Sequence, residues 1–196
     1  RDMESTLLAN KAKVVGSESA ARECAGVESW IADNVDLGVG GVAPTGDGTD
    51  ALTPGTNRAF TEAQLQGVLA SIWDEGGEPD TIMVGSVIKQ AMSGLVNGGA
   101  AGTAQRVVDG NAKTVTAAID IYVSDFGSLA VVPNRFQVQT SMLVLQMDMW
   151  CMSTLAEFQE TPLAKTGDSD RVQLLSEYTL EAKNAKSSGI ISALTS

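Results

Sequence analysis

Three carboxylates in the second half of the chain come closest to residues that could do chemistry. Asp168 and Asp170 stand two positions apart in a segment of turn-forming residues, where such a pair could at most make a weak cation site. Asp148 lies in an otherwise apolar stretch, and a catalytic carboxylate there would need a partner that the sequence does not indicate. A small-molecule hydrolase or transferase that uses these residues therefore remains one alternative.

The run Lys165-Thr166-Gly167-Asp168 has the composition of a nucleotide-binding loop but not its order. A P-loop places its glycine before the lysine and opens a helix, whereas here the glycine follows the lysine and a strand pattern comes next. The chain contains no histidine, which is the commonest general base and metal ligand. We therefore predict no catalytic residues, no cofactor and no metal site.

The sulfur-containing residues favour packing over chemistry. Cys24 and Cys151 fit no zinc-binding spacing and sit in apolar patterns, so we expect buried free thiols, with a disulfide between them left open. The four methionines between residues 142 and 152 could suggest a soft-metal site. Methionine more commonly fills irregular gaps in a hydrophobic core, and we expect that role here.

The overall composition indicates a folded protein with an acidic surface. Its 196 residues are 43% hydrophobic, which is enough for one or two subdomains around a core. Thirteen basic and 24 acidic residues give a net charge of −11, which disfavours generic binding to nucleic acid. No apolar run approaches the roughly 20 residues of a membrane-spanning helix, and no signal peptide is visible.

Apolar periodicity predicts that the first part of the chain is helical. Residues 1–34 are expected to form a helix in two pieces, divided at Gly16-Ser17. The apolar face of the second piece consists of Ala20, Cys24, Val27 and Ile31. The glycine-rich stretch from Asp36 to Ala59 then predicts a long loop.

The clearest helix follows this loop. Thr61 and Gln64 form a capping box in front of a helix over 62–75, and Phe60 can pack against Leu65. A short strand at 81–84 and a second helix over 87–96 come next. Their tight connections predict helices that flank a sheet.

Strand patterns fill the middle of the chain. Residues 113–123 alternate if the strand has a kink near Ala117-Ala118, and the turn at 124–127 leads to a return strand over 128–132. Residues 142–152 predict one strand with apolar side chains on both faces, which is typical of a strand covered on both sides.

The longest strand pattern lies near the carboxyl-terminal end. Residues 161–171 predict a turn, with Pro162 and Gly167 as its bend-forming residues. Residues 172–184 then alternate as a strand of about a dozen residues with one buried and one exposed face. The predicted buried face consists of Val172, Leu174, Tyr178, Leu180 and Ala182. The tail after Asn184 is expected to turn and pair back on this strand.

The same region resembles a known protein family. The runs Leu163-Ala164-Lys165-Thr166-Gly167-Asp168-Ser169 and Glu177-Tyr178-Thr179-Leu180-Glu181 are similar to the carboxyl-terminal signature of the phage SU10-type major head protein family. Further matches are Lys183-Asn184, Gly189-Ile190-Ile191, Asp125-Phe126-Gly127, Val131-Val132-Pro133-Asn134-Arg135, the 143–150 strand and Ala25-Gly26-Val27-Glu28-Ser29-Trp30. One departure is Ser188, where the family pattern has histidine.

This resemblance implies an α+β fold of the HK97-like capsid type, with axial (A) and peripheral (P) domains. Residues 1–35 would be the spine helix of the peripheral domain, residues 36–140 the axial domain, and residues 141–196 the peripheral strands and the carboxyl-terminal segment. The amino-terminal arm and the E-loop of such proteins would lie upstream of Arg1, so we expect this chain to lack them.

The resemblance also implies a function. The expected protein is the major capsid protein of a tailed double-stranded DNA phage or prophage, a structural subunit and not an enzyme. It would assemble into pentamers and hexamers of an icosahedral head and enclose DNA without sequence-specific binding. Scaffold and portal proteins are expected partners, a membrane is not, and the protein would be found in the virion after assembly in the host cytoplasm. An encapsulin-like nanocompartment shell is the alternative within the same fold.

Two expectations about contacts follow from this assignment. Without an arm and an E-loop, the chain should be mostly monomeric in solution. The candidate inter-subunit contacts are Lys165, Asp168, Asp170, Glu177, Glu181 and Lys183.

Overall fold

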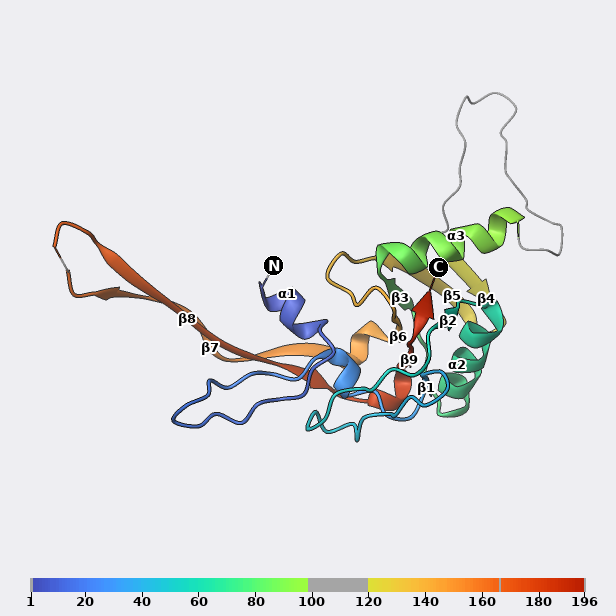
Figure 1. The fold of residues 1–196 in the computed structure, drawn as a ribbon, viewed down its shortest axis with the longest axis horizontal. Helices are drawn as coiled ribbons and strands as arrows, with labels where there is room; N and C mark the ends of the chain where they lie inside the picture. Colours follow the sequence, from blue (N-terminus) through green and yellow to red (C-terminus); the bar gives the residue numbers. More distant parts are fainter. Residues whose placement is uncertain (1, 99–119, 166, 196) are drawn as a thin grey trace, which may run out of the picture.

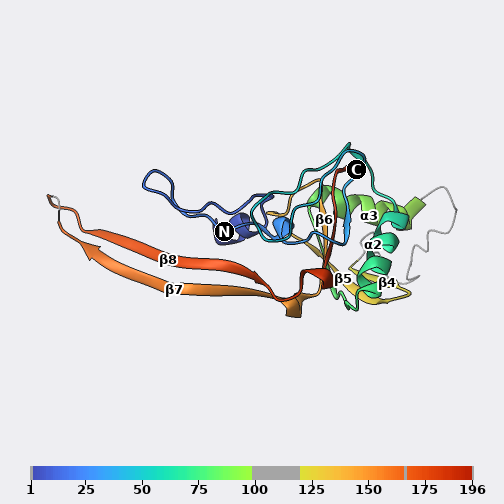
Figure 2. The same cartoon turned by 90° about the horizontal axis from the view of Figure 1, so that it is seen from below.

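The computed structural model describes residues 2–98, 120–165 and 167–195. Figure 1 shows a mixed α+β body from which one long two-stranded ribbon projects, and Figure 2 shows the same ribbon from a perpendicular direction. The helical segments are α1 (Asp2–Leu7), η1 (Val27–Ser29), α2 (Glu62–Asp74), α3 (Ser86–Gly98), η2 (Met147–Met149) and η3 (Ala185–Ser187). The strands are β1 (Val35–Asp36), β2 (Arg58–Ala59), β3 (Thr81–Val84), β4 (Ile121–Ser124), β5 (Gly127–Pro133), β6 (Met142–Leu145), β7 (Trp150–Leu163), β8 (Arg171–Ala182), β9 (Gly189–Ile191) and β10 (Leu194–Thr195).

The body is organised around a six-stranded sheet in the order β1-β9-β6-β3-β5-β4. β1 runs parallel to β9 and β3 parallel to β5, whereas the other neighbours are antiparallel. β2 and β10 form a separate parallel pair, and β7 and β8 form the ribbon. The expectation that the tail pairs with the long strand is wrong, because the fully buried β9 lies between β1 and β6 in the central sheet.

Strand β6 lies in the interior of this sheet and is covered on both faces. All four of its residues are buried. Met142 and Val144 belong to one hydrophobic cluster, while Leu143 and Leu145 belong to another. Because side chains alternate across a strand, the two clusters lie on opposite faces of the sheet. The predicted burial of both faces is therefore confirmed for residues 142–145.

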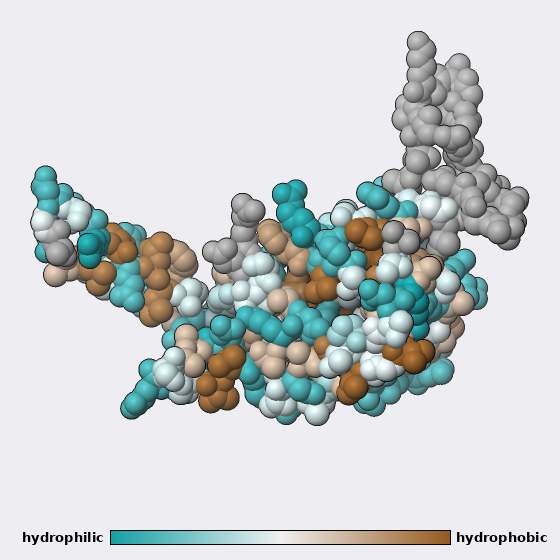
Figure 3. Space-filling view, in the orientation of Figure 1, coloured by the Kyte–Doolittle hydropathy of each residue, from teal (hydrophilic) through white to brown (hydrophobic). Residues whose placement is uncertain are grey.

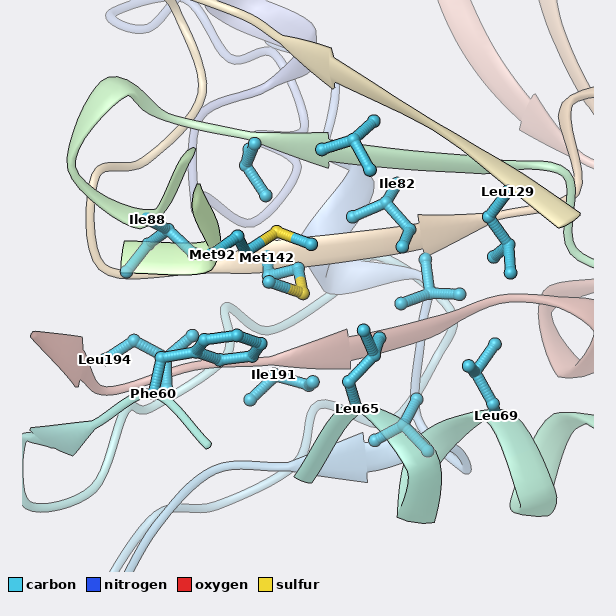
Figure 4. Close-up of a cluster of buried hydrophobic side chains, with 14 of the residues drawn as sticks. Phe60, Leu65, Leu69, Ile82, Ile88, Met92, Leu129, Met142, Ile191 and Leu194 are labelled. Carbon is cyan, nitrogen blue, oxygen red and sulfur yellow. The ribbon is translucent and has the colours of Figure 1, made fainter. Parts of the chain in front are cut away.

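Both long helices pack on the same face of the sheet. Figure 4 shows Leu65 and Leu69 of α2 and Ile88 and Met92 of α3 around the sheet residue Met142. The opposite face is covered by irregular chain from the first part of the sequence. That second cluster contains Leu8, Val27, Ile31, Leu37 and Leu52, together with Leu143, Leu145 and Ile190.

Helix α2 forms where the sequence predicts it. The Thr61 backbone N–H donates to Gln64 Oε1 at 2.8 Å, so the capping box satisfies an amide that the helix itself leaves unpaired. Phe60 and Leu65 are buried in the same cluster. The helix ends before Gly76, whose φ of 82° suits glycine because it has no Cβ.

The helix predicted over residues 1–34 is wrong except at its start. Between residues 2 and 34, only α1 and the short η1 are helical, and Val14 pairs with Glu23 through an isolated antiparallel bridge. At Gly26 the chain passes so close to Ala9 that a Cβ would lie 1.7 Å from the Ala9 carbonyl oxygen. The apolar spacing misled because Val27 and Ile31 reach the core through a single turn, while Ala20 stays exposed. No long spine helix is present in the described part of this segment.

The single strand predicted over residues 142–152 is also wrong, because the chain leaves the central sheet after β6. The short helix η2 turns the backbone, and β7 begins at Trp150 in the ribbon. The indole N–H of Trp150 donates to Ser188 Oγ at 2.9 Å, and Ser188 is fully buried. The residue that departs from the family pattern therefore anchors the base of the ribbon.

The hairpin predicted at 124–127 is confirmed. Ser124 pairs with Gly127, so Asp125 and Phe126 form a two-residue turn between β4 and β5. The strand expected from residue 113 is described only from residue 120. The kink predicted near Ala117-Ala118 lies outside the described residues.

We predict that Ser188→Ala lowers the free energy of unfolding by about 1–3 kcal/mol, because the partly buried Trp150 indole N–H then loses its acceptor. Chemical denaturation followed by tryptophan fluorescence measures this loss. The control is Ser128→Ala, at an exposed serine in β5, which should change the stability by less than about 0.5 kcal/mol. Equal effects of the two substitutions would contradict the proposed role of Ser188.

Candidate interaction surface

The ribbon is a long antiparallel pair that leaves the body. β7 has 14 residues and β8 has 12, more than twice the usual strand length of about 5–6. Their register runs from Trp150 opposite Ala182 at the root to Leu163 opposite Arg171 at the far end. It shifts between Thr154 and Ala156 and again between Ala156 and Gln159, which is where bulges interrupt regular pairing.

The turn at the end of the ribbon is shorter than predicted. β7 continues through Pro162, which pairs with Val172, and the connection starts only after Leu163. Proline fits there because both strands of a two-stranded ribbon are edge strands, so a missing N–H can face solvent. Gly167 has a φ of 77°, which confirms a bend at the predicted glycine.

The two faces of the ribbon differ in chemistry. Side chains directly opposite each other share a face, so Trp150, Met152 and Pro162 lie with the even-numbered residues of β8. We call this the apolar face, and its β8 members Val172, Leu174, Tyr178, Leu180 and Ala182 are those that the sequence predicts to share a face. The other side, the polar face, carries Glu177 and Glu181.

Burial of the apolar face is confirmed only at the root. There Trp150 and Leu180 pack against the second hydrophobic cluster of the body. Farther out, Val172 is 49% exposed and Leu174 is 59% exposed. Leu155 and Phe158, in the irregular stretch of β7, are 81% and 71% exposed. Figure 3 shows hydrophobic residues gathered along the projecting ribbon with nothing of the chain over them.

The six predicted contact residues fall into two groups. Lys165, Asp168 and Asp170 lie at the exposed tip of the ribbon, where Lys165 Nζ is 2.8 Å from Asp170 Oδ1. Such exposed ion pairs contribute at most about 1 kcal/mol. Glu177 and Glu181 lie on the polar face nearer the root, and Lys183 follows the last residue of β8. The structure thus places five of the six in the ribbon or its tip and Lys183 at the ribbon root.

A groove of about 1150 Å³ lies between the ribbon root and the irregular amino-terminal segment. The segment side contributes Lys11, Lys13, Val14, Val15, Ala21, Arg22, Glu23, Cys24 and Trp30, among others. The ribbon side contributes residues 153–155 and 175–179. Arg22 Nη2 lies 3.1 Å from Glu177 Oε1, and Lys11 Nζ lies 3.0 Å from Glu23 Oε2, so ion pairs close parts of its rim.

A buried carboxyl group joins the amino-terminal segment to the body. Glu28 in η1 is 1% exposed, and the Ser141 hydroxyl donates to Glu28 Oε1 at 2.5 Å. Gln137 Nε2 in turn donates to Ser141 Oγ at 2.9 Å. Burial raises the pKa of Glu28 from 4.5 to about 7, and the hydrogen bond from Ser141 partly offsets that rise.

The carboxylates considered for catalysis do not come together. Asp148 is exposed in η2 beside the ribbon root, whereas Asp168 and Asp170 lie at the opposite end of the 14-residue β7. Within residues 2–98, 120–165 and 167–195, no group of three or more Cys, Asp or Glu side chains could hold a metal ion. Among the same residues, no helix has the length and apolarity that crossing a membrane requires.

The structure shows whether the two cysteines are buried and whether a disulfide joins them. Both cysteines are free, so no disulfide joins them. Cys24 is only partly buried and Cys151 is exposed, and the expected burial of both thiols is therefore wrong. The reason for Cys151 is its place on the polar face of a ribbon that leaves the core.

Sequence reasoning missed the exposed apolar residues in the middle of β7. Leu155 and Phe158 belong to a stretch to which no element was assigned, because bulges break its alternation. The length of the predicted strand over 172–184 could have revealed them. A strand of about a dozen residues that follows a glycine turn needs a partner strand of similar length before the turn, which here is β7. Glu28 and the groove were also missed, since their surroundings come from segments far apart in the chain.

A long, exposed ribbon with an apolar face is typical of proteins that bind other proteins over an extended surface. A family model described as SU10 major capsid protein matches residues 1–195, and the chain belongs to this family. The major capsid protein of Escherichia phage Phieco32 is 24% identical over 143 residues. That alignment spans 72% of this chain and 40% of the relative, so less than half of that protein's length is matched.

Two solved structures match this chain at low similarity. The cyanophage A-1(L) capsid asymmetric unit matches with a TM-score of 0.45 and 16% identity, covering 73% of this chain and 48% of that chain. The virus-like particle from Pyrococcus furiosus matches with a TM-score of 0.40 and 6% identity, covering 69% of this chain and 54% of the other.

The raised pKa of Glu28 gives a prediction about pH. A buried acid whose folded-state pKa exceeds its unfolded value stabilises the fold fully below pH 4.5, and this contribution is lost as the pH rises through about 7. The shift from 4.5 to about 7 corresponds to about 3 kcal/mol. We expect Glu28→Gln to remove this dependence and to be more stable than the parent above pH 7. Denaturation curves at pH 4.5, 6 and 8 for both proteins measure the difference.

The control for this prediction is Glu18→Gln, at an exposed position of the same segment. Its stability should follow that of the parent protein at all three pH values. A difference between Glu28→Gln and the parent that does not change with pH would contradict the role of Glu28 ionisation.

Proposed function

We propose that this chain is a structural subunit that builds the shell of a tailed-phage or prophage head by self-association. The observation that carries the proposal is the family match over residues 1–195. The projecting ribbon supports it physically, because its outer apolar side chains are left in water by the chain itself. Burial of a side chain such as Leu155 or Phe158 against another molecule would contribute roughly 1.5–3 kcal/mol.

The proposal extends to the architecture. An HK97-like arrangement would place residues 36–140 in the axial domain and residues 141–196 in the peripheral domain. The ribbon would be the main peripheral element, and residues 1–35 would belong to the same domain as irregular chain around α1 and η1. The central sheet draws on both parts, since β3 and β5 come from the first range and β6 and β9 from the second.

The proposed partners are further copies of the same protein, arranged as pentamers and hexamers. Lys165, Asp168 and Asp170 at the ribbon tip, with Glu177, Glu181 and Lys183 nearer the root, are the proposed polar contacts. The shell would enclose DNA without reading its sequence, and the net charge of −11 agrees with a shell that does not bind DNA tightly. We further propose that scaffold and portal proteins are partners of the shell. Assembly would take place in the host cytoplasm, and the protein would end in the virion.

The ribbon provides the test of this function. We expect the double variant Leu155→Asp and Phe158→Asp in the whole protein to prevent assembly, because two carboxylates would replace apolar groups at the proposed contact. Negative-stain electron microscopy of the parent protein should show capsomers or shells, and the variant should show neither. Circular dichroism should be unchanged, since both side chains are exposed within the chain.

Val39→Asp is the matched control, because Val39 is equally exposed but lies outside the ribbon. It should assemble like the parent protein. Normal shells from the double variant would contradict the role of the ribbon. Failure of the parent protein to form capsomers under any condition would contradict the shell function itself.

The prediction that the chain alone is mostly monomeric concerns residues 1–196 without any further segment. A single ribbon contact is weak, so we expect a monomer at micromolar concentration in light scattering. Stable pentamers or hexamers of this chain alone would contradict it.

A further inference from the structure

A small buried polar cluster joins the amino-terminal segment to the central sheet. Glu28 of η1 and Ser141, the residue before β6, are 113 positions apart in the chain, and each is 1% exposed. Their side-chain oxygens lie 2.5 Å apart. Gln137 Nε2 donates to the same Ser141 hydroxyl, while Gln137 Oε1 has no hydrogen-bond partner in the described part of the chain. Glu28 is the ionisable member of this cluster, so its charge bears directly on the contact between the two segments.

No basic side chain among the described residues pairs with Glu28. The charged residues on the elements around η1 are instead paired with one another or exposed, namely the pairs Lys11–Glu23, Arg58–Asp36 and Lys186–Glu75, Lys186 also near Asp33, and the exposed Glu4 and Arg135. The pKa of Glu28 is raised from 4.5 to about 7 by burial, and the hydrogen bond from Ser141 partly offsets this rise. A change of charge at Glu28 in the closed structure therefore falls near neutral pH.

Ser141 can bond to either protonation state of Glu28. Its hydroxyl donates to the ionised carboxylate. It can equally accept the proton of the neutral acid and donate to the Val138 carbonyl oxygen, which lies 3.4 Å away. The hydrogen bond is thus available in both states, whereas burial penalises only the ionised one. Ionisation consequently favours any arrangement in which Glu28 reaches water.

The amino-terminal segment can reach such an arrangement without unfolding the body. Residues 13–23 are exposed, and a region with much exposed chain opens at a lower cost than the whole fold. Helices α2 and α3 pack on the opposite face of the sheet, so their cluster does not depend on this segment. The far end of the segment is fixed, because the Ile190 N–H donates to the Asn34 carbonyl oxygen at 2.9 Å. Opening would therefore stop before Asn34.

We propose that Glu28 is a proton-controlled latch, which in its neutral form holds η1 against the start of β6 and on ionisation releases residues 2–33 from the sheet. Release uncovers part of the second hydrophobic cluster, to which β6 contributes Leu143 and Leu145. The proton concentration then controls whether this apolar surface is exposed. The latch acts within one molecule, so it holds or fails independently of the shell function proposed above.

The direction of the pH dependence follows from the two pKa values. Below pH 4.5, Glu28 is neutral in both the closed and the open state, and the latch is fully closed. Its hold weakens as the pH rises and levels off above about pH 7. Between pH 5.5 and pH 8, the equilibrium constant for opening should increase about 30-fold.

Amide hydrogen exchange of the whole protein, followed by mass spectrometry between pH 5.5 and pH 8, tests the latch. The parent protein and Glu28→Gln are compared at each pH, so that the pH dependence of the exchange chemistry cancels in the ratio of their rates. For residues 24–33 we expect the ratio of parent to variant to rise about 30-fold over this range. For residues 62–74 of α2 it should stay within about twofold. Glu18→Gln, at an exposed position, is the matched control and should follow the parent.

Ser141→Ala gives a second and independent test. Because the hydroxyl favours the ionised carboxylate, its removal raises the pKa of Glu28 further, and the rise in exchange should move to higher pH. A midpoint that stays or moves to lower pH would overturn the latch, and this comparison with the parent decides the matter even if Glu28→Gln does not fold. A parent-to-variant ratio that is constant with pH would also overturn it. So would an equal rise in residues 62–74, since the whole body would then be unfolding.

Discussion

A two-stranded ribbon has no second layer to cover its side chains, and this constraint governs the rest of the molecule. Isolated hairpins are marginally stable in water, so a pair as long as β7 and β8 requires packing on at least one face. The body provides that packing only at the root, through Trp150, Leu180 and the hydrogen bond to buried Ser188. Beyond the root, the apolar face is available only to another molecule or to further segments of the same protein.

The ribbon is continuous with the most deeply buried strands of the body. β6 leads into β7 through η2, and β8 leads into β9 through η3, so both ribbon strands start from neighbouring strands of the central sheet. The Lys183 backbone N–H donates to the Met149 carbonyl at 2.9 Å and holds the two connections together. A force applied to the ribbon is therefore transmitted to strands whose residues are packed on both faces, which makes the projecting element stiff at its base.

Sequence reasoning succeeded where neighbours along the chain decide the structure. The α2 helix carries its own start signal in Thr61 and Gln64. The alternation of β8 places Val172, Leu174, Tyr178 and Leu180 on one face without reference to any partner strand. The 124–127 turn is equally local. The family resemblance was visible for the same reason, because the residues that carry it form contiguous runs around the ribbon tip and in β8.

The sequence-based predictions fail where contacts between segments far apart in the chain determine the local structure. Val27 and Ile31 have helical spacing, but the close approach of Gly26 to Ala9 and the bridge between Val14 and Glu23 fix a different backbone. The apolar run from Met142 gives no sign that half of it belongs to a sheet and half to a ribbon. The groove and the Glu28–Ser141 hydrogen bond depend on contacts across more than 100 residues, which no local pattern contains.

Weak contacts between such surfaces suit a shell better than strong ones. If copies associate as proposed, the exposed apolar residues of the ribbon attract while the net charge of −11 on every copy repels, so a contact between only two subunits would form and break readily. In a closed ring of such subunits, each subunit would be held by two neighbours, and the second contact would form at a high effective concentration. Reversible pairing allows misplaced subunits to leave, whereas closure retains those placed correctly. An uncovered apolar ribbon would favour aggregation of an isolated protein. It is consistent with a subunit whose apolar surface becomes buried when copies assemble.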